Sequence, residues 1–549
     1  RRSASLLKET IDKLITEKLD AKNLICDSNT FCIADLGCAT GPNTFFLVQD
    51  IIKSVETTLD SNSTKAEFLV FFNDLTNNDF NTLFTSLPQD RSYFAVGVPG
   101  SFYGRVLPQS SVHIVVTLAA THWLSSVPKE LFDKSSKAWN KGKVHYSNAA
   151  EEVVKAYEDQ FGRDMEKFLE ARAQEIVSGG LLVVGMCGIP QGMPFSNLAD
   201  SIMYTSMADV LIQMQSQRRS ASLLRETIDK LIMEKIDAKT LISCTNTFHI
   251  ADLGCATGPN TFSLVEDIIK SIDTSLQSNS TKPEFLVFFN DLPSNDFNTL
   301  FTSLPPDRSY FAVGVPGSFY SRILPQSSVH IVLTVGATHW LSSVPKEVLD
   351  KSSKAWNKGK VHYSNASEEV VKAYEEQFGR DMERFLEARA KEIVSGGLLV
   401  VGMCGIPLGM PFSNLADSIM YNSMADVLIQ MQSQGLISEE QVDTFNVPIY
   451  SASPEEVTVL VEKNGCFTIE FMELMDPTAW LKRPMDVEDV RQWIVCIKAT
   501  MGSLFINHFG DHLLDDIFDR LTTKLVGLTE KVESSYREKV MLFFALKRK

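Results

Sequence analysis

The sequence predicts an α/β fold built on a mostly parallel sheet, preceded by an incomplete second copy of the same fold. Three observations lead to this prediction. Short apolar runs alternate with helical patterns, which is typical of strand–helix–strand units. A block of 217 residues occurs twice, and a tail of 115 residues (435–549) occurs once. Runs that are apolar on both faces suit the buried strands of a parallel sheet.

The expected elements alternate along the chain from residue 248 onward. The expected strands of the repeated block are Phe248–Leu253, Phe285–Phe289, Val329–Val335 and Leu398–Met403. A helical stretch from Glu368 to Val394 precedes the last of them. The tail adds strand candidates at Cys466–Glu473 and Met541–Leu546, and amphipathic helices around Val490–Phe505 and His512–Leu525. The sheet is therefore seven strands wide if the tail completes it.

The repeat defines two expected domains. RRSASLLKETIDKLI at Arg1 recurs as RRSASLLRETIDKLI at Arg218, and the offset of 217 holds until Gln217, which matches Gln434. We call residues 1–217 the first copy and residues 218–549 the second copy; residues 435–549 are the tail. The first copy is expected to be a partial duplicate without the C-terminal part. Its strand near Leu181–Met186 would then lack neighbours, and we expect it to be the less stable copy.

Composition narrows the classes of function. The formal net charge is -16, so a basic surface for nucleic acid is not expected. No apolar run is long enough to span a bilayer, and no membrane partner is expected. The nine cysteines show no paired metal spacing, and some are not kept between the copies; for example, Cys26 becomes Ser243 and Cys32 becomes His249. These exchanges indicate that the cysteines are free thiols in a reducing compartment. The sequence therefore predicts a cytoplasmic location.

Three segments indicate a cofactor site. IADLGCATGPN (Ile250–Asn260) places a strand ending in Asp252 before a turn with Gly254 and Gly258. Glycines there let the backbone approach a ligand closely, at the strand end where open α/β sheets bind ligands. The spacing is not the G-x-G-x-x-G of dinucleotide folds, and no P-loop lysine is present. The turn suits a cofactor without phosphate, such as S-adenosylmethionine, although a purely structural strand-to-helix turn explains it as well.

The second and third segments follow later strands. In FFNDL (288–292), the carboxylate of Asp291 could accept two hydrogen bonds from a ribose diol; a helix N-cap is the alternative. In GVPGSFYSRILP (314–325), Ser318 offers a hydroxyl and Phe319 a ring face for adenine. A core aromatic is the alternative for Phe319.

Together with THWLSSVP, AWNKGKVHY, DTFNVPIYSASPEE and NHFG, these motifs resemble the SABATH family of plant methyltransferases, named for its salicylic acid, benzoic acid and theobromine enzymes. The resemblance covers the second copy almost throughout. It implies a Rossmann-like class I methyltransferase fold with a helical cap, S-adenosylmethionine as cofactor and a homodimeric assembly. It also implies a methionine site at Asp252, Gly254, Cys255 and Asn260, a ribose site at Asp291 and Leu292, and an adenine site at Ser318 and Phe319.

The resemblance also implies a substrate site. Trp340 matches the family's tryptophan, whose indole N–H donates to the acceptor carboxylate, and His339 precedes it. Salicylate-type enzymes have a tyrosine where this chain has Gly336, and a tryptophan in the cap where it has Tyr421. These differences favour the branch of loganic-acid and farnesoic-acid methyltransferases over salicylate enzymes.

Two further sites follow from the resemblance. Gln217 occupies the place of the glutamine that ends the family's Ser-Tyr-x-x-Asn-Ser-x-x-Gln signature and contacts the substrate, whereas the other signature positions are not matched. Some members carry magnesium, and the matching ligands are Asn357, Asp443, the carbonyl of Phe445, and Asn446. Oxygen ligands of this kind suit a hard cation such as Mg²⁺.

These inferences predict a methyltransferase that converts a small-molecule carboxylate to its methyl ester. Carboxylates are ionised at neutral pH, so no general base is required and no catalytic acid–base residue is expected. Trp340, His339 and Gln217 would only position the acid for in-line displacement of the methyl group. N-methylation of a purine alkaloid is one alternative, and a non-catalytic duplicated relative is the other.

Overall fold

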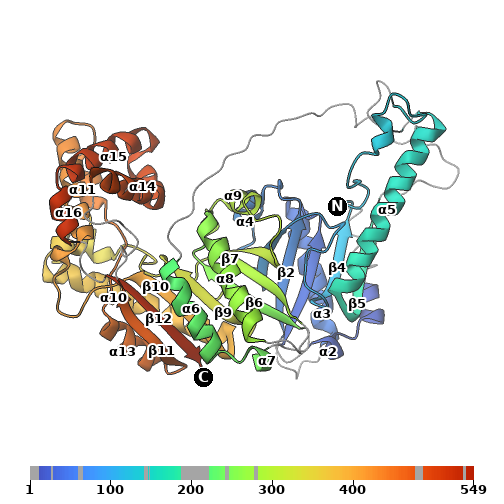
Figure 1. Ribbon diagram of the computed structural model, residues 1–549, viewed down its shortest axis with the longest axis horizontal. Coiled ribbons are helices and arrows are strands. Elements are labelled where there is room, and N and C mark those ends of the chain that lie inside the picture. The colour runs from blue at the N-terminus through green and yellow to red at the C-terminus, as the bar shows by residue number, and fades with distance from the viewer. Residues whose placement is uncertain are drawn as a thin grey trace. The chain divides into compact units, whose positions relative to one another are not determined.

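The computed structural model (Figure 1) consists of two compact units. It describes residues 11–25, 29–59, 66–140, 146, 149–186, 222–241, 246–276, 282–475, 486–535 and 540–549. The first unit comprises Arg1–Val332 and Lys391–Gly397, and the second comprises Leu333–Ala390 and Leu398–Lys549. The units group residues by packing, whereas the predicted domains follow the repeat. The first unit therefore holds the first copy together with the beginning of the second.

The first copy contributes five of the described strands to the first unit. These strands are β1 (Thr30–Leu36), β2 (Glu67–Asp74), β3 (Tyr93–Pro99), β4 (Val112–Leu118) and β5 (Ile176–Gly185). Its described helices are α2 (Ala21–Leu24), α3 (Pro42–Thr58), α4 (Phe80–Thr85), η1 (Lys129–Leu131) and α5 (Glu151–Glu175). The pairs β1–β2, β2–β3, β1–β4 and β4–β5 are all parallel.

The second copy repeats this pattern in the first unit. Its strands there are β6 (Thr247–Leu253), β7 (Glu284–Asp291), β8 (Tyr310–Pro316) and the start of β9 (Val329–Val335). Its helices are α6 (Ser222–Lys235), α7 (Ala238–Leu241), α8 (Pro259–Ser275) and α9 (Phe297–Thr302). The strand order of the unit is β9-β6-β7-β8-β3-β2-β1-β4-β5. Among the described strands, β3 and β8 alone join the copies, in antiparallel orientation at Gly97 and Gly314.

Local sequence explains these elements. Six successive residues of β7 are buried, as expected for a central strand covered on both faces. Helix α8 begins with Pro259 after Gly258, because proline has no N–H to satisfy and a helical φ in the first turn. Asp296 caps α9 by accepting from the Thr299 N–H at 3.1 Å.

The second unit contains the tail and the rest of the second copy. Its strand order is β9-β10-β12-β11, with β10 at Ile393–Cys404, β11 at Phe467–Met475 and β12 at Met541–Arg548. Strand β12 is antiparallel to both neighbours. Its helices are η4 (Lys346–Val348), η5 (Tyr363–Asn365), α10 (Glu368–Glu392), η6 (Phe412–Asn414), α11 (Ala416–Ser433), α12 (Glu439–Thr444), α13 (Pro454–Asn464), α14 (Val487–Phe509), α15 (Asp511–Val526) and α16 (Thr529–Ser535). Residues 218–549 thus supply seven described strands, β6 to β12, and the predicted α/β architecture with a mostly parallel sheet is confirmed.

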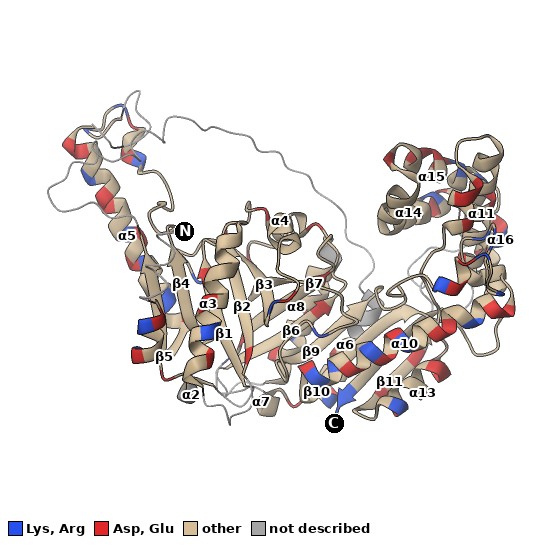
Figure 2. Ribbon diagram, turned by 180° about the vertical axis from the view of Figure 1, so that it is seen from behind, with Lys and Arg blue, Asp and Glu red and all other residues tan. Residues whose placement is uncertain are grey.

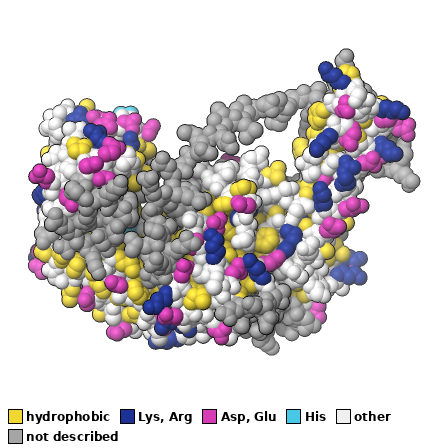
Figure 3. Space-filling view, in the orientation of Figure 1, with side chains coloured by type: hydrophobic (Ala, Val, Ile, Leu, Met, Phe, Trp, Pro, Cys, Tyr) yellow, Lys and Arg dark blue, Asp and Glu magenta, His cyan; other side chains and the backbone are white. Residues whose placement is uncertain are grey.

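The predicted helical cap is formed by α11, α14, α15 and α16. Their apolar faces meet in one cluster that includes Met424, Leu428, Val490, Phe505 and Leu521, each fully buried. In the ribbon of Figure 2, acidic and basic residues are interspersed along α5 and α10. On the face shown in Figure 3, hydrophobic side chains lie among charged side chains of both signs. None of the described helices is long and apolar enough to cross a membrane.

The last strand of the repeated block has a different environment in the two copies. In β10, every residue from Leu398 to Met403 is buried. Its duplicate β5 has no fully buried residue, and among the described strands it pairs with β4 alone. Likewise, Trp123 of the first copy is 63% exposed, whereas its counterpart Trp340 packs against the apolar cluster of the cap. The described part of the first copy therefore ends just after a strand that no described strand covers on its outer side, as its missing tail predicts.

Candidate cofactor and substrate sites

The turn after β6 is held by the neighbouring strand. The N–H groups of Gly254 and Cys255 donate to the carbonyl of Asn290 at 2.8 and 3.0 Å. Gly254 has φ +74°, a conformation that favours glycine. Asp252 at the end of β6 is buried and accepts from the Thr261 hydroxyl of α8. The predicted methionine-binding residues Asp252, Gly254 and Cys255 thus lie together at the carboxyl end of β6.

Asp291 lies at the carboxyl end of β7, next to this turn. Its Oδ1 accepts from the Leu292 N–H at 2.7 Å and its Oδ2 from the Ala256 N–H at 2.9 Å. These bonds fix the carboxylate, and each oxygen keeps a second lone pair for a ligand. Leu292 is 52% exposed beside it. Asp291 does not begin a helix, because the cap of α9 is Asp296.

Asn290 connects the three strand ends, and it was not among the site residues predicted from the sequence. The residue is fully buried. Its backbone carbonyl holds the turn after β6, and its side-chain amide donates to the carbonyls of Val315 and Gly317 at 2.8 and 2.9 Å. The signal was present in the FFNDL motif, since an amide inside an apolar strand needs buried partners. Asn290 therefore positions the residues around Asp252, Asp291 and Ser318.

The two carboxyl groups are electrostatically unusual. Burial raises the pKa of Asp252 to about 7, its bond from Thr261 opposes this rise, and the charge of Asp291 adds to it. Burial also raises the pKa of Asp291. A carboxylate such as Asp252, at the predicted methionine site, is complementary to a cation, whereas Asp291 lies at the predicted ribose site. The ammonium and sulfonium groups of S-adenosylmethionine are cations, so the residues of this site fit that cofactor.

The loop after β8 carries Ser318 and Phe319, both partly buried. The Gly317 N–H donates to the Asp291 carbonyl at 2.9 Å, which ties the loop to β7. Farther along, the N–H groups of Ile323 and Leu324 donate to one carboxylate oxygen of Glu392 at 2.6 and 2.9 Å. Ser318 and Phe319 therefore stand at the third adjacent strand end, where the resemblance places adenine.

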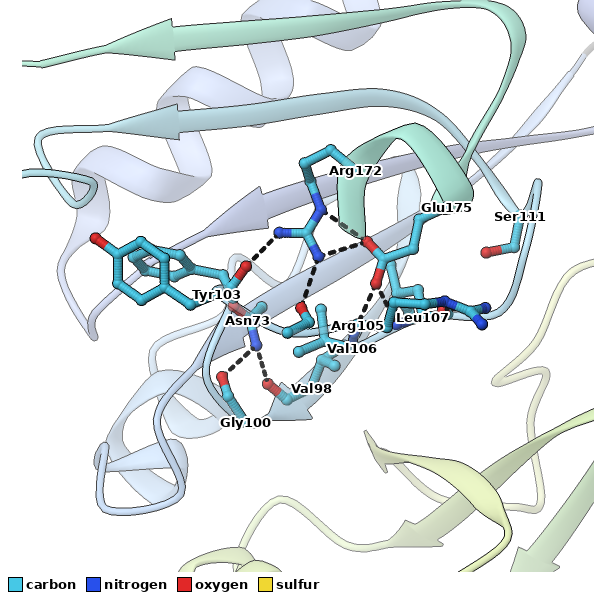
Figure 4. Close-up of polar contacts among 12 residues, drawn as sticks. Asn73, Val98, Gly100, Tyr103, Arg105, Val106, Leu107, Ser111, Arg172 and Glu175 are labelled. Carbon is cyan, nitrogen blue, oxygen red and sulfur yellow. Dashed lines mark hydrogen bonds and ion pairs between the residues drawn. The ribbon is translucent and has the colours of Figure 1, made fainter. Parts of the chain in front are cut away.

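The first copy shows how the equivalent loop is braced (Figure 4). Buried Arg172 donates to Glu175 at 2.8 Å and to the carbonyls of Phe102 and Gly104 at 2.6 and 2.9 Å. Glu175 in turn accepts from the N–H groups of Val106 and Leu107 at 2.6 and 2.9 Å. Charge-assisted bonds from one helix thus fix the whole loop after β3.

The first copy repeats the cofactor-site geometry. Asp74 accepts from the Ala39 and Leu75 N–H groups, each at 2.8 Å, and Thr44 donates to Asp35. Burial likewise raises the pKa of Asp35 to about 7. Local geometry therefore does not distinguish the copies at this site.

Two predicted site residues are described only in part or not at all. Asn260 lies in the first turn of α8, and its side chain lies outside the described part of the chain. Gln217 lies outside the described residues, so its predicted substrate contact stays a prediction.

The second unit contains a pocket of about 210 Å³ at the carboxyl ends of β9 and β10. His339 lies on its wall, and Gly336 has φ +79° with no atom within 4 Å of the place that a Cβ would take. Trp340 and Tyr421 are not among its lining residues; Tyr421 is buried and stacks on His362 at 4.0 Å. The pocket is lined by Val335, Gly336, His339, Gly402, Met403, Cys404, Leu415, Ala416, Asp417, Ser535, Val540 and Met541.

His339 and Asp417 are the ionisable groups of this pocket wall besides the Cys404 thiol. Burial lowers the pKa of His339 to about 4, so the ring is neutral at pH 7, and its Nδ1 has no hydrogen-bond partner among the described residues. Burial raises the pKa of Asp417 to about 6. Asp417 was not predicted from the sequence, although it stands four residues before Tyr421, one helical turn away on the same face.

Of the four predicted magnesium ligands, two are hydrogen-bonded to each other and a third accepts a bond from a backbone N–H. The Asn357 amide donates to Asn446 Oδ1 at 2.7 Å, and the Gly359 N–H donates to Asp443 Oδ1 at 3.1 Å. Phe445 is buried against Phe505 and Phe509. Asp443 is the one carboxylate of the set, and Mg²⁺ held by one carboxylate completes its six oxygen ligands largely with water. The Asn357–Asn446 bond also anchors the loop before α10 to the segment after α12, and the magnesium site stays a prediction.

Comparison with known proteins gives consistent matches. The family described as SAM dependent carboxyl methyltransferase matches residues 1–218 and again 213–549. Loganic acid O-methyltransferase of Catharanthus roseus is 42% identical over 328 residues, which is 59% of this chain and 87% of that protein. Farnesoic acid carboxyl-O-methyltransferase of Arabidopsis thaliana is 39% identical over 303 residues, covering 55% and 84%. A solved loganic acid methyltransferase with SAH is 41% identical and superposes with a TM-score of 0.57, covering 59% of this chain and 92% of that one.

Proposed function

The chain belongs to the SAM-dependent carboxyl methyltransferases, and from this premise we propose that its second copy methylates the carboxylate of a small organic acid carrying a hydroxyl group. S-adenosylmethionine supplies a methyl group on a positively charged sulfur. The observation that carries the proposal is the pair of carboxyl groups at the ends of adjacent strands: Asp252 is buried, Asp291 is partly buried, and the pKa of each is raised. The acid is already ionised at neutral pH, so the chain has only to bind, orient and exclude water.

We assign the cofactor to the second copy, although the first copy has the same local geometry. The second copy alone continues into the tail. Trp340 packs against the cap cluster, while Trp123 is exposed.

Matched substitutions in the two copies test this assignment. Asp291→Ala should abolish binding of S-adenosylhomocysteine in calorimetry and abolish methyl transfer, because Asp291 presents two fixed carboxylate oxygens. Asp74→Ala removes the same contacts from the first copy. This change should leave most of the S-adenosylhomocysteine binding and most of the methyl transfer. If Asp74→Ala proves the more damaging change, the cofactor belongs to the first copy.

Asp417 supports the choice of a hydroxylated acid. It lies on the wall of the 210 Å³ pocket, and burial raises its pKa with no hydrogen bond from the described residues to oppose the rise. A carboxylate there repels the acid group of the substrate and would instead accept a hydrogen bond from a donor elsewhere on it. His339, neutral at pH 7, adds no charge and leaves Asp417 to set this preference.

The test is methyl transfer to pairs of plant acids that differ by one hydroxyl, with extraction of the labelled ester. The native chain should favour the hydroxylated member. Asp417→Leu should reduce that preference by roughly 10–100-fold, since hydrogen bonds to charged groups are worth about 1.5–3 kcal/mol. An unchanged preference would refute the role of Asp417, whereas transfer to purine nitrogens and not to acids would refute the carboxylate proposal itself.

The described cysteines are free thiols, and this supports a cytoplasmic site for the reaction.

A further inference from the structure

The surface that joins the two copies lies wholly inside the first unit. Strand β3 is parallel to β2 on one side, and β8 is parallel to β7 on one side. On their other sides β3 and β8 meet each other, antiparallel, at Gly97 and Gly314. Without this contact, each would be an exposed edge strand with unpaired N–H and C=O groups.

The polar contacts across this surface occur in two equivalent sets. Arg105 donates to both carboxylate oxygens of Glu284 at 2.6 Å. Arg322 donates to both oxygens of Glu67 at 2.7 Å. These pairs are the same residues with the copies exchanged, because the repeat offset of 217 relates Arg105 to Arg322 and Glu67 to Glu284. Such exchange is the property of an isologous two-fold interface.

Charge pairing at each end is reinforced in the same symmetric way. The guanidinium carbon of Arg105 lies 5.1 Å from the ring centre of Phe311, and that of Arg322 lies 5.1 Å from that of Phe94. A bidentate arginine over an aromatic ring is geometrically demanding. Two matched instances indicate a specific interface.

The centre of the surface is apolar and as buried as a protein core. Phe80 packs edge-on against Phe301 at 4.7 Å, and Phe84 against Phe297 at 4.6 Å. All four rings are at most 2% exposed. A Cβ on Gly314 would lie 2.6 Å from the Phe301 ring, so glycine at the strand crossing is what lets these rings pack.

We propose that the first copy acts as a covalently attached dimerisation partner for the second copy, so that the chain is a monomer whose β8 edge is closed from within. This replaces the homodimer that the family resemblance implied. The occupant of the edge is the first copy of the same chain. Residues 186–221 join β5 to α6, and 36 residues span at most roughly 120–130 Å.

Mass action favours the attached occupant. Both copies present the same surface, so a second chain could in principle pair through it. A tethered partner has an effective concentration on the order of 0.1–1 mM. A separate chain at about 1 μM would therefore be at a 100-fold to 1,000-fold disadvantage. The role does not require the first copy to bind cofactor or substrate, and it stands whether or not the proposed reaction is correct.

Cross-linking of the full chain tests the proposal. The Asn298 N–H donates to Asn81 Oδ1 at 3.3 Å, so Asn81→Cys with Asn298→Cys places two thiols on either side of the interface. Mild oxidation should give a species of monomer mass, 61.2 kDa, with altered mobility on a non-reducing gel. The native chain and each single variant, oxidised alike, show the background from native cysteines. Light scattering of the native chain should also give the monomer mass.

Several outcomes would overturn the proposal. A covalent dimer from the double variant means that copies pair between chains. A covalent dimer from Asn298→Cys alone means that second copies pair with each other. A monomer without the internal cross-link means that the copies do not pair.

Swapping the two charges of one ion pair across the interface provides an independent check. Arg322→Glu should speed amide exchange in β3 and β8, and adding Glu67→Arg should restore protection. Failure of the second change to restore it would also count against the interface.

Discussion

The different environments of β5 and β10 lead to a prediction about two equivalent valines. Val401 in β10 is fully buried, whereas Val184, its counterpart in β5, is 36% exposed. Val401 lies opposite Phe544 of β12, and β10 also neighbours β9. Val184 lies opposite Thr117 of β4 only, among the described strands. Substituting either valine with alanine removes the same atoms from two different surroundings.

The expected magnitudes follow from these surroundings. Valine to alanine removes the equivalent of two methylene groups, worth about 0.8 kcal/mol each when fully buried. At Val401 a cavity term adds to this, because β9 and β12 prevent full collapse, for a total of about 2–3 kcal/mol. At Val184 less area is lost and water fills the gap, so the loss should stay below about 1 kcal/mol.

Hydrogen exchange with mass spectrometry measures both effects in the full chain. Val401→Ala should speed exchange in the β10 peptide by roughly 30–150-fold, since each 1.4 kcal/mol is a factor of ten. Val184→Ala should change the β5 peptide by less than about fivefold. In the native chain β5 should already exchange faster than β10. Equal effects at the two positions would refute the reasoning that the tail gives the strands their different stability.

Two more predictions concern charge at the sites. The raised pKa of Asp252, about 7, means that the folded chain binds an extra proton between pH 4 and 7, so stability without ligand should fall as pH rises through that range and level off above it. Affinity for the cationic cofactor should rise over pH 6–8 as Asp252 ionises, and titration calorimetry should find this rise absent in Asp252→Asn. Chelation with EDTA should leave the melting temperature within about 1 °C and methyl transfer unchanged, because Asn357 and Asn446 already bond to each other; loss of either would show that a metal does bind there.

Much of the fold could be predicted because apolar runs mark buried strands. The expected strand Val329–Val335 coincides with β9, and Phe248–Leu253 differs from β6 by one residue. The helix expected at His512–Leu525 is α15, Asp511–Val526. Strand β8 was not among the expected strands, because Gly314 and Pro316 interrupt its apolar run. Gly314 is required by the close approach of the Phe301 ring. Pro316 is required by the loop that follows the strand.

The site could be predicted only where a motif is continuous. Asp252, Asp291 and Ser318 belong to three motifs, and parallel strands bring their ends together. Asp417 was not predicted, because its place on a pocket wall depends on residues of β9, β10 and the C-terminal part of the chain. The pairing of β3 with β8 was not predicted for the same reason. A single contact between strands far apart in the chain produces no periodic pattern in the sequence.

The exposed strand of the first copy has a consequence for how the protein behaves in concentrated solution. The ten residues of β5, IVSGGLLVVG, are identical to the start of β10 and contain no charge. A sequence that is buried in the interior of the sheet as β10 therefore also stands, as β5, last in the order of the described strands, without the lysines or glutamates that usually keep edge strands from pairing between molecules. Colloidal stability would then be governed by these ten residues and only weakly by the net charge of -16.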